Sequence, residues 1–147
     1  MKRFLPPHLF FCCILFILGV SIYPLGPSFL SFPWNLTGIV LIVVGLAITL
    51  VSNRAFTEAE TNIKTFDAPD QFVRDGLFAY SRNPMYLGFV LSLCGMAICA
   101  GVWIALLAPI LFFELSAYWY IPFEEDVMRA TFGEEYLAYC QQTRRWL

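Results

Sequence analysis

Four apolar runs dominate the chain, and polar residues gather mainly between the second and third runs and after the fourth. The runs cover residues 9–25, 36–51, 86–100 and 102–121. A helix that spans a bilayer needs ~20 apolar residues, with a range of roughly 17 to 25. The second and third runs are therefore short, and they fit a thin or locally thinned bilayer, or a tilted, re-entrant third segment. The pattern predicts an all-α integral membrane protein with about four transmembrane helices and a C-terminal cytoplasmic helical segment.

The composition supports this interpretation. Hydrophobic residues make up 59% of the 147 residues and charged residues 14%, with a mean hydropathy of +0.68, far from the balance of a soluble domain. The length and the few polar residues between the runs indicate one domain, residues 1–147. The net charge of −2 gives no reason to expect a nucleic-acid partner. The first run resembles a signal peptide, but no small-residue cleavage pattern follows it, so we expect a retained helix.

The charges predict an orientation. All nine Lys and Arg residues precede the first run, follow the second run, or follow the fourth. The two opposite connections, around residues 26–33 and at Gly101, carry no charge. The positive-inside rule therefore places both termini and the polar segments 52–85 and 122–147 in the cytoplasm, with the spans in the inner or plasma membrane of the cell.

Glu114 is the exception among the acidic residues, because it lies inside the fourth apolar run. A carboxyl group there is costly and usually faces a bundle interior or a wet cavity. A functional role and a protonated glutamic acid bonded to a neighbouring helix explain it equally well. The five cysteines form no CxxC pair, and the single histidine, His8, lies at the start of the first run. No metal site is predicted.

The polar segment 52–85 begins as a helical extension of the second run and turns at Asp75 and Gly76. At its end Asn83 precedes Pro84, which is typical of a helix N-cap followed by proline at the first helical position. This local role explains both residues without any chemistry.

The polar segment 122–147 predicts two helix starts. Pro122 is followed by acidic residues, which is typical of a first helical turn. Thr131 and Glu134 have the spacing of a capping box, which predicts that a helix restarts there. Taken singly, these features need only structural explanations.

Four short motifs nevertheless follow one another in a specific order, with an apolar hairpin after the first. They are Arg82-Asn83-Pro84-Met85-Tyr86, Glu124-Glu125, Phe132-Gly133-Glu134-Glu135-Tyr136 and Arg145-Trp146. The ordered set resembles the isoprenylcysteine carboxyl methyltransferase family and its phospholipid methyltransferase relatives, over roughly residues 60–147. The chain departs from many members by carrying Asn83 in place of histidine, and Arg144 in place of a proline before the terminal arginine.

The resemblance implies an S-adenosylmethionine-dependent methyltransferase whose acceptor is a lipophilic molecule that enters from the bilayer. The methylated group would be a carboxylate, a thiol or an amine. The candidate catalytic residues are Arg82, Asn83, Tyr86 and Glu114. The candidate cofactor-binding residues are Arg82, Asn83, Pro84, Tyr86, Glu124, Glu125, Tyr136 and Arg145.

Each part of the cofactor would need a different partner. Glu124 or Glu125 would bind its ammonium, because charge-assisted hydrogen bonds are strong. Arg82 or Arg145 would bind its carboxylate, and the first amides of the third helix, next to Asn83, would supply further donors. The candidates for packing the adenine ring or the sulfonium are Tyr86, Tyr136 and Trp146.

Two other classes of protein remain as alternatives. Four short spans with one intramembrane carboxylate are typical of a small proton-coupled transporter, with Glu114 as the coupling group. Such a transporter needs little cytoplasmic structure, whereas this chain has two long polar segments. A noncatalytic membrane scaffold would explain the topology but not the ordered motifs.

Overall fold

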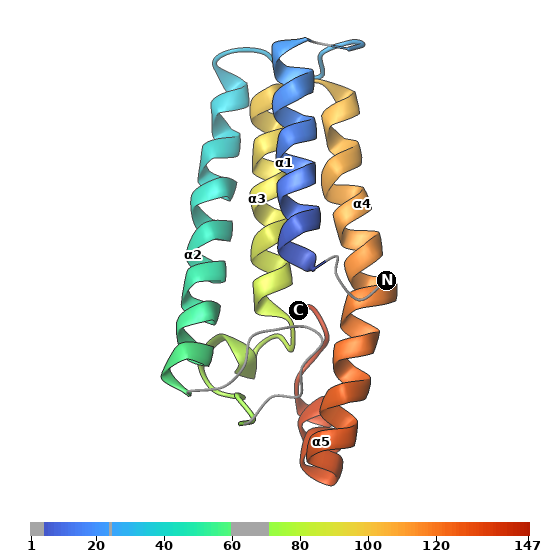
Figure 1. Ribbon diagram of the computed structural model, residues 1–147. Coiled ribbons are helices and arrows are strands. Elements are labelled where there is room, and N and C mark those ends of the chain that lie inside the picture. The colour runs from blue at the N-terminus through green and yellow to red at the C-terminus, as the bar shows by residue number, and fades with distance from the viewer. Residues whose placement is uncertain (1–4, 24, 60–70) are drawn as a thin grey trace.

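The computed structural model describes residues 5–23, 25–59 and 71–147, and within them it contains helices and isolated bridges but no β-strand. Four helices lie side by side, and a fifth continues beyond one end of the bundle (Figure 1). They are α1 (Pro6–Ile22), α2 (Gly38–Glu58), α3 (Pro84–Ala100), α4 (Leu107–Leu115) and α5 (Ile121–Gln142). The short helical turns are η1 (Trp34–Thr37), η2 (Gly76–Ala79), η3 (Trp103–Leu106) and η4 (Ser116–Tyr120). The expected all-α architecture is confirmed.

Two helical stretches are long and apolar enough to cross a membrane, Trp34–Glu58 and Trp103–Gln142. Pro6–Ile22 and Pro84–Ala100 are apolar but shorter. Each apolar run of the sequence thus forms a helix, although the boundaries shift by several residues. The polar extension after the second run is helical as expected, since α2 continues to Glu58.

Glycines bring α2 and α3 into backbone contact. A Cβ atom on Gly45 would lie 2.5 Å from the carbonyl oxygen of Gly88, and one on Gly38 would lie 2.2 Å from that of Gly95. Both members of each pair must therefore lack a side chain. Small residues at a helix interface allow such close approach, and van der Waals packing then holds the helices together without a hydrophobic driving force.

A tight turn at Gly101 joins α3 to the α4 run. Gly101 has a φ of 68°, in the left-handed region that glycine adopts without a steric penalty. Its carbonyl accepts a hydrogen bond from the amide of Phe29 at 2.8 Å. The turn makes α3 and α4 antiparallel, as the sequence indicated, and so brings the start of α3 to the same end of the bundle as α5 (Figure 1).

The helix start expected at Pro122 is present, since α5 begins at Ile121 with Pro122 and the acidic Glu124 in its first turn, but the backbone is also helical from α4 into α5 without a break. The segment before the proline, η4, is a π-helix, and its last residue leads directly into Ile121. Proline lacks an amide hydrogen and clashes with the carbonyl four residues earlier. The π-helical turn η4 lies directly before the proline, and such turns are rare and occur mostly as single-turn bulges within α-helices.

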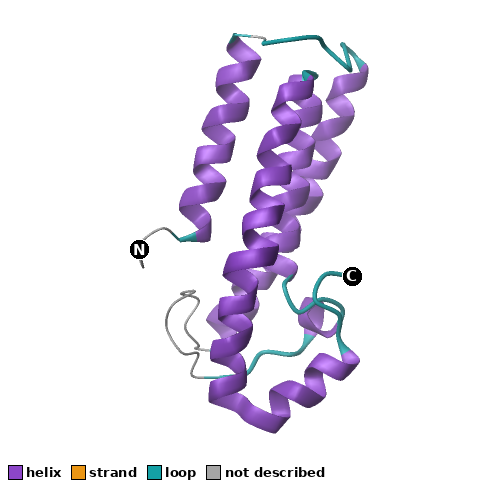
Figure 2. Ribbon diagram, turned by 90° about the vertical axis from the view of Figure 1, so that its right-hand side faces the viewer, coloured by secondary structure: helices purple, strands orange, loops and turns teal. Residues whose placement is uncertain are grey.

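The break expected near Thr131 is present, but a different residue causes it. Gly133 has φ 53° and ψ −124°, which divides α5 into two segments, and Figure 2 shows the second segment folded back toward the bundle. The hydroxyl of Thr131 donates to the carbonyl of Val127 and therefore does not cap the new segment.

Candidate functional site

The C-terminal tail is bonded to the segment that precedes α3, so the first and last motifs of the sequence meet. The amide of Arg82 donates to the carbonyl of Arg144 at 2.9 Å. The side-chain nitrogen Nδ2 of Asn83 donates to the carbonyl of Arg145 at 3.0 Å. Asn83 occupies the N-cap position of α3 as expected, but its side chain makes no cap hydrogen bond. It attaches the tail instead.

Glu125 lies between two arginines and is almost fully buried, with 3% of its surface exposed. Its Oε1 accepts from Nη2 of Arg82 at 2.9 Å, and its Oε2 accepts from Nη2 of Arg145 at 2.6 Å. Burial alone would raise the pKa of this carboxyl, but the hydrogen bonds and charges of Arg145 and Arg82 outweigh it and hold the pKa below its usual value. The hydrogen bond to Glu125 likewise raises the pKa of Arg145. These three side chains join α3, α5 and the tail.

Arg82 is held from several sides. Its Nη1 donates to the carbonyls of Cys140 and Thr143, at 3.2 and 3.1 Å. Its Nε is buried and has no hydrogen-bond partner among the described residues. The end of the guanidinium therefore has a structural role.

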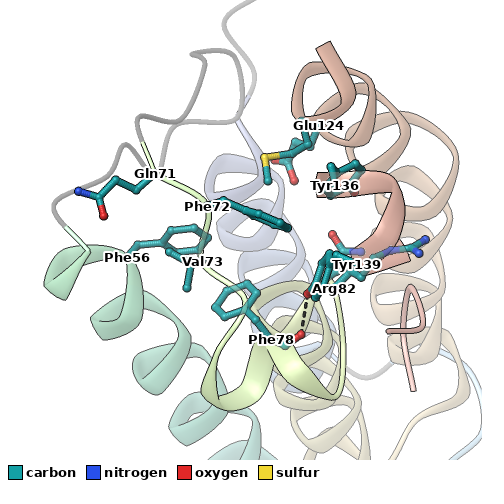
Figure 3. Close-up of a pocket in the computed structure, with 11 residues that line it drawn as sticks. Phe56, Gln71, Phe72, Val73, Phe78, Arg82, Glu124, Tyr136 and Tyr139 are labelled. Atoms are coloured by element: carbon teal, nitrogen blue, oxygen red, sulfur yellow. Dashed lines mark hydrogen bonds between the residues drawn. The ribbon is translucent and has the colours of Figure 1, made fainter. Parts of the chain in front are cut away.

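A cavity of about 110 Å³ opens beside this cluster (Figure 3). Its walls come from the end of α2, the segment before α3, and both parts of α5. The lining residues are Phe56, Gln71, Phe72, Val73, Phe78, Arg82, Asn83, Glu124, Met128, Tyr136 and Tyr139. The cavity thus combines aromatic walls with one arginine and one carboxylate.

Glu124 is placed in the cavity wall by Tyr86. The hydroxyl of Tyr86 donates to Oε1 of Glu124 at 2.8 Å. Tyr86 itself is buried, with its ring 6.5 Å from that of Phe112 on α4. The two neighbouring glutamates therefore differ, because Glu125 pairs with arginines while Glu124 faces the cavity.

Phe72 forms the centre of the aromatic wall. Its ring stacks on Phe132 at 5.2 Å and meets the edges of Tyr136 and Tyr139, at 5.9 and 5.2 Å. Tyr139 also donates from its hydroxyl to the carbonyl of Phe78, the contact drawn in Figure 3. Burial raises the pKa of Tyr139 to about 12 and also raises the pKa of Tyr136. Both phenols are therefore neutral hydrogen-bonding groups near neutral pH.

The structure brings four of the candidate residues to the cavity: Arg82, Asn83, Glu124 and Tyr136. Three of the others, Pro84, Tyr86 and Glu125, are buried and do not line the cavity. Arg145 holds Glu125, and the side chain of Arg144 is exposed. Trp146 packs 4.9 Å from Phe113 on α4 and does not line the cavity.

Glu114 lies elsewhere. The sequence allowed it to face the bundle interior or a wet cavity, and the first of these is wrong, because its side chain is exposed on the outer face of α4. The amphipathic rule fails here because the buried stripe of α4 consists of Ala108, Pro109 and Phe112, which leaves Glu114 on the opposite side. The transporter interpretation loses the interior carboxylate that it required.

Sequence reasoning missed most of the aromatic wall. Phe56, Phe72 and Phe78 lie in the polar segment between the second and third apolar runs, and no apolar periodicity relates them. Aromatic residues in a polar segment were the available signal. Their convergence depends on the positions of α2 and α5, which no local pattern encodes.

These features define a class of protein: an apolar helical bundle with a polar, aromatic-walled cavity at the end where its two polar segments meet. The model of the phospholipid methyltransferase family matches residues 34–135. The match covers more than half of the chain, and the protein belongs to the phospholipid methyltransferase family. The resemblance drawn from the ordered motifs is thus confirmed. The searches of curated proteins and of solved structures gave no match.

Proposed function

We propose that the protein transfers a methyl group from S-adenosylmethionine to a lipophilic acceptor at the cytoplasmic face of a membrane. The observation that carries this proposal is the cavity in which Arg82, from the first motif, meets Glu124 and Tyr136, from the later ones. A family of phospholipid methyltransferases needs a site that admits a water-soluble cofactor next to a lipid. A cavity at the end of an apolar bundle meets that need.

The residues of the cavity fit the cofactor. The buried Nε of Arg82 lacks a partner among the described residues and would donate to the cofactor carboxylate. Glu124 would accept from its ammonium, and charge-assisted bonds of this kind are stronger than neutral ones. Phe72 and Tyr136 offer aromatic faces to the adenine ring, for which stacking contributes roughly 1–3 kcal/mol per base.

The size of the cavity limits what the described residues enclose. Its volume of about 110 Å³ is below the roughly 300–1,000 Å³ of typical ligand pockets. The described walls therefore enclose only part of the cofactor, and the rest would extend beyond them.

The cofactor, when bound, supplies an electrophilic methyl group. The chain's own task is to hold the reactants in line and to exclude water, and alignment alone lowers a barrier by roughly 7 to 11 kcal/mol. The hydrogen bond from Tyr86 fixes the direction of the Glu124 carboxylate. The ion pairs of Glu125 with Arg82 and Arg145 fix the wall behind it. A carboxylate acceptor needs no base, whereas an amine acceptor must first lose a proton.

The exposed aromatic residues support a position in a membrane. Trp34 and Trp103 are exposed at one end of the bundle, and Tyr118 and Trp119 are exposed toward the other. Trp103 and Trp119 are separated by about 24 Å at the rise of an α-helix, several Å less than the ~30 Å hydrocarbon core of a typical bilayer. Such belts mark membrane–water interfaces. With the distribution of basic residues, they support placing α5 and the cavity on the cytoplasmic side.

The test is calorimetric titration of S-adenosylmethionine into the full-length protein in detergent. Glu124→Gln should weaken binding about tenfold or more, since a hydrogen bond to a charged group contributes roughly 1.5–3 kcal/mol. Phe72→Leu should weaken it by a similar factor through lost stacking. The matched control is Asp126→Asn, because Asp126 is exposed and pairs only with Arg129 among the described residues.

Saturable binding that the two cavity variants weaken and the control does not would support the site. Transfer of a labelled methyl group into a membrane lipid extract would then support the reaction. Failure of the folded wild-type protein to bind the cofactor would reject the proposal. Equal loss in Asp126→Asn would reject Glu124 as the specific ligand.

A further inference from the structure

The carboxyl group of Glu114 lies on the outer face of the apolar bundle, apart from the cavity described above. Its side chain is exposed, and it follows Trp103 by roughly 17 Å at the rise of an α-helix, inside a stretch that is long and apolar enough to cross a membrane. Ionisable groups at such a depth are costly and almost always pair with another polar group or face water. Among the described residues no ion pair of Glu114 is found, so a partner is expected beyond them.

A histidine lies at a similar depth on the neighbouring helix. The thiol of Cys13 on α1 donates to the carbonyl of Ala108 on α4, and the two helices run in opposite directions (Figure 1). His8 precedes Cys13 by about 8 Å, and Glu114 follows Ala108 by about 9 Å, at the helical rise. Both side chains therefore lie toward the same end of the bundle, and both are exposed.

The capping contact of His8 determines which ring nitrogen can donate. The amide of Leu5 donates to Nδ1 of His8 at 3.3 Å, so Nδ1 acts as the acceptor. In a neutral imidazole the other nitrogen, Nε2, then carries the hydrogen. His8 thus presents a donor that matches a carboxylate, and a charge-assisted hydrogen bond of this kind is stronger than a neutral one.

An apolar groove of about 320 Å³ separates the two helices on this face. Its lining residues are Leu9, Cys12, Cys13, Phe16, Leu107, Ala108 and Leu111. Phe11 and Leu15 each directly precede a lining residue on α1, and 63% and 68% of their surfaces are exposed. Apolar helices associate by close packing of such surfaces. The face therefore offers both projecting side chains and a hollow that can receive them.

The same face also carries a donor on α1 and an acceptor on α4. A two-fold axis along the membrane normal places α1 of each copy against α4 of the other, because an isologous interface uses the same patch twice. Each His8 then meets a Glu114, and the projecting α1 side chains of each copy meet a groove. An unrelated partner would have to supply both features independently, so charge complementarity favours a second copy of this chain.

We propose that α1 and α4 form a symmetric interface with a second copy of the chain, in which Glu114 accepts a hydrogen bond from His8 of the partner subunit. Phe11 and Leu15 of each copy pack into the groove of the other. The interface and the cavity assigned to the cofactor share no residue, because no residue that lines the cavity belongs to α1 or α4. The inference therefore goes beyond methyl transfer and does not depend on it.

The test is Förster transfer between donor-labelled and acceptor-labelled copies of the full-length protein in phosphatidylcholine liposomes, with the dyes at the C-terminus. The wild type should associate saturably as the protein-to-lipid ratio rises. His8→Glu places two carboxyl groups opposite each other, and Glu114→His places two imidazoles there. Each change should weaken association by about tenfold or more, the loss expected for a hydrogen bond to a charged group.

Mixing the two variants separates a contact between copies from a contact within one copy. His8→Glu copies combined with Glu114→His copies again join an imidazole to a carboxyl group at both contacts, so association should return to near the wild-type level. The matched control is Glu58→His, because Glu58 is an exposed carboxylate on α2. Mixing Glu58→His with His8→Glu should restore nothing.

Two alanine substitutions of matched exposure test the packing. Phe11→Ala on α1 should weaken association severalfold, whereas Val40→Ala on α2 should leave it unchanged; the two side chains are 63% and 64% exposed. Neither change disturbs the core, so this pair decides the position of the interface even where a charged variant fails to fold.

Three outcomes would overturn the inference. Transfer no greater than that between randomly mixed labelled lipids would mean that the wild type is a monomer. Failure of the two charged variants to associate with each other, while circular dichroism shows both folded, would remove the pairing of His8 with Glu114. Equal weakening by Phe11→Ala and Val40→Ala would place the contact on another face of the bundle.

Discussion

The contact between α2 and α3 and the contacts around α5 hold the same bundle together in opposite ways. Between α2 and α3, four glycines remove side chains so that backbones touch. Around α5, hydrogen bonds from long side chains hold the segments together. Arg82 and Arg145 donate to Glu125, and Tyr139 donates to the carbonyl of Phe78. The first contact tolerates no added atom, and the second tolerates no lost charge.

The difference follows from the surroundings of each contact. Among apolar helices, close van der Waals contact is the main gain available. Where the chain leaves the apolar bundle, charged groups bring specific geometry, because arginine forks bind a carboxylate in one orientation. The cavity is built at the second kind of contact, where positions can be fixed and polar ligands admitted.

The largest loss of stability is expected when the charged contact around Glu125 is removed. Glu125→Ala leaves the nearly buried Arg82 and the partly exposed Arg145 without their anion, and removing one partner of a buried pair costs about 3–5 kcal/mol. The measurement is chemical unfolding in detergent, followed by near-ultraviolet circular dichroism. Asp126→Ala is the control, since its side chain is 72% exposed and its pair should contribute under about 1 kcal/mol. Equal stabilities for the two variants would contradict a structural role for Glu125.

The next largest loss of stability is expected when a side chain is added at the glycine contact between α2 and α3. Gly45→Ala would place a Cβ 2.5 Å from the carbonyl of Gly88 and should cost about 1–3 kcal/mol through overpacking. Gly19→Ala on α1 is the control, because nothing lies within 4 Å of its added atom, and it should stabilise the helix by about 0.5–1 kcal/mol. The measurement is the thermal unfolding midpoint of both variants, compared with that of the wild type. A neutral Gly45→Ala would mean that α2 and α3 are farther apart.

Alkaline pH should weaken the α5 region specifically. The pKa of Tyr139 is raised from 10.0 to about 12 in the folded chain, so the folded state keeps a proton that the unfolded state loses between these values. Stability should therefore be fully present below pH 10 and fall as the pH rises toward 12. Tyr139→Phe should lower stability by about 1 kcal/mol at neutral pH through the lost hydrogen bond.

The same variant should also make the alkaline decline shallower. Unfolding midpoints measured from pH 8 upward would show this, with Tyr80→Phe as the control because Tyr80 is 76% exposed. An unchanged slope in Tyr139→Phe would assign the alkaline effect to another group, first of all to Tyr136, whose pKa is also raised.

The smallest effect is expected for the exposed pair of Arg74 and Glu135, which are 58% and 53% exposed. Arg74→Ala should change the free energy of unfolding by less than about 1 kcal/mol, and salt should remove the difference. Unfolding at low and high ionic strength is the measurement. A large, salt-resistant loss would contradict this, because it would show that the pair is shielded from solvent and salt.

Much of the fold followed from local patterns. The apolar runs became helices, Gly101 became a left-handed turn and Asn83 took the position before the first residue of α3. Local rules misplaced what depends on neighbours. Pro122 lies at the start of α5 as expected, but η4 joins that helix to α4 without the interruption expected before it. Glu114 turned outward because other residues of α4 filled the core.

The sequence by itself determined the helical class, the family and the motif blocks that build the site, since periodicity, apolar length and motif order are properties of the chain alone. Only the tertiary structure decided which glutamate faces the cavity and which arginine holds its wall. Glu124 and Glu125 are adjacent and chemically identical, so their roles depend on how α5 is rotated against α3 and the tail. That rotation is set by long-range contacts, from Arg82 to Glu125 and from Tyr86 to Glu124, which no local pattern specifies.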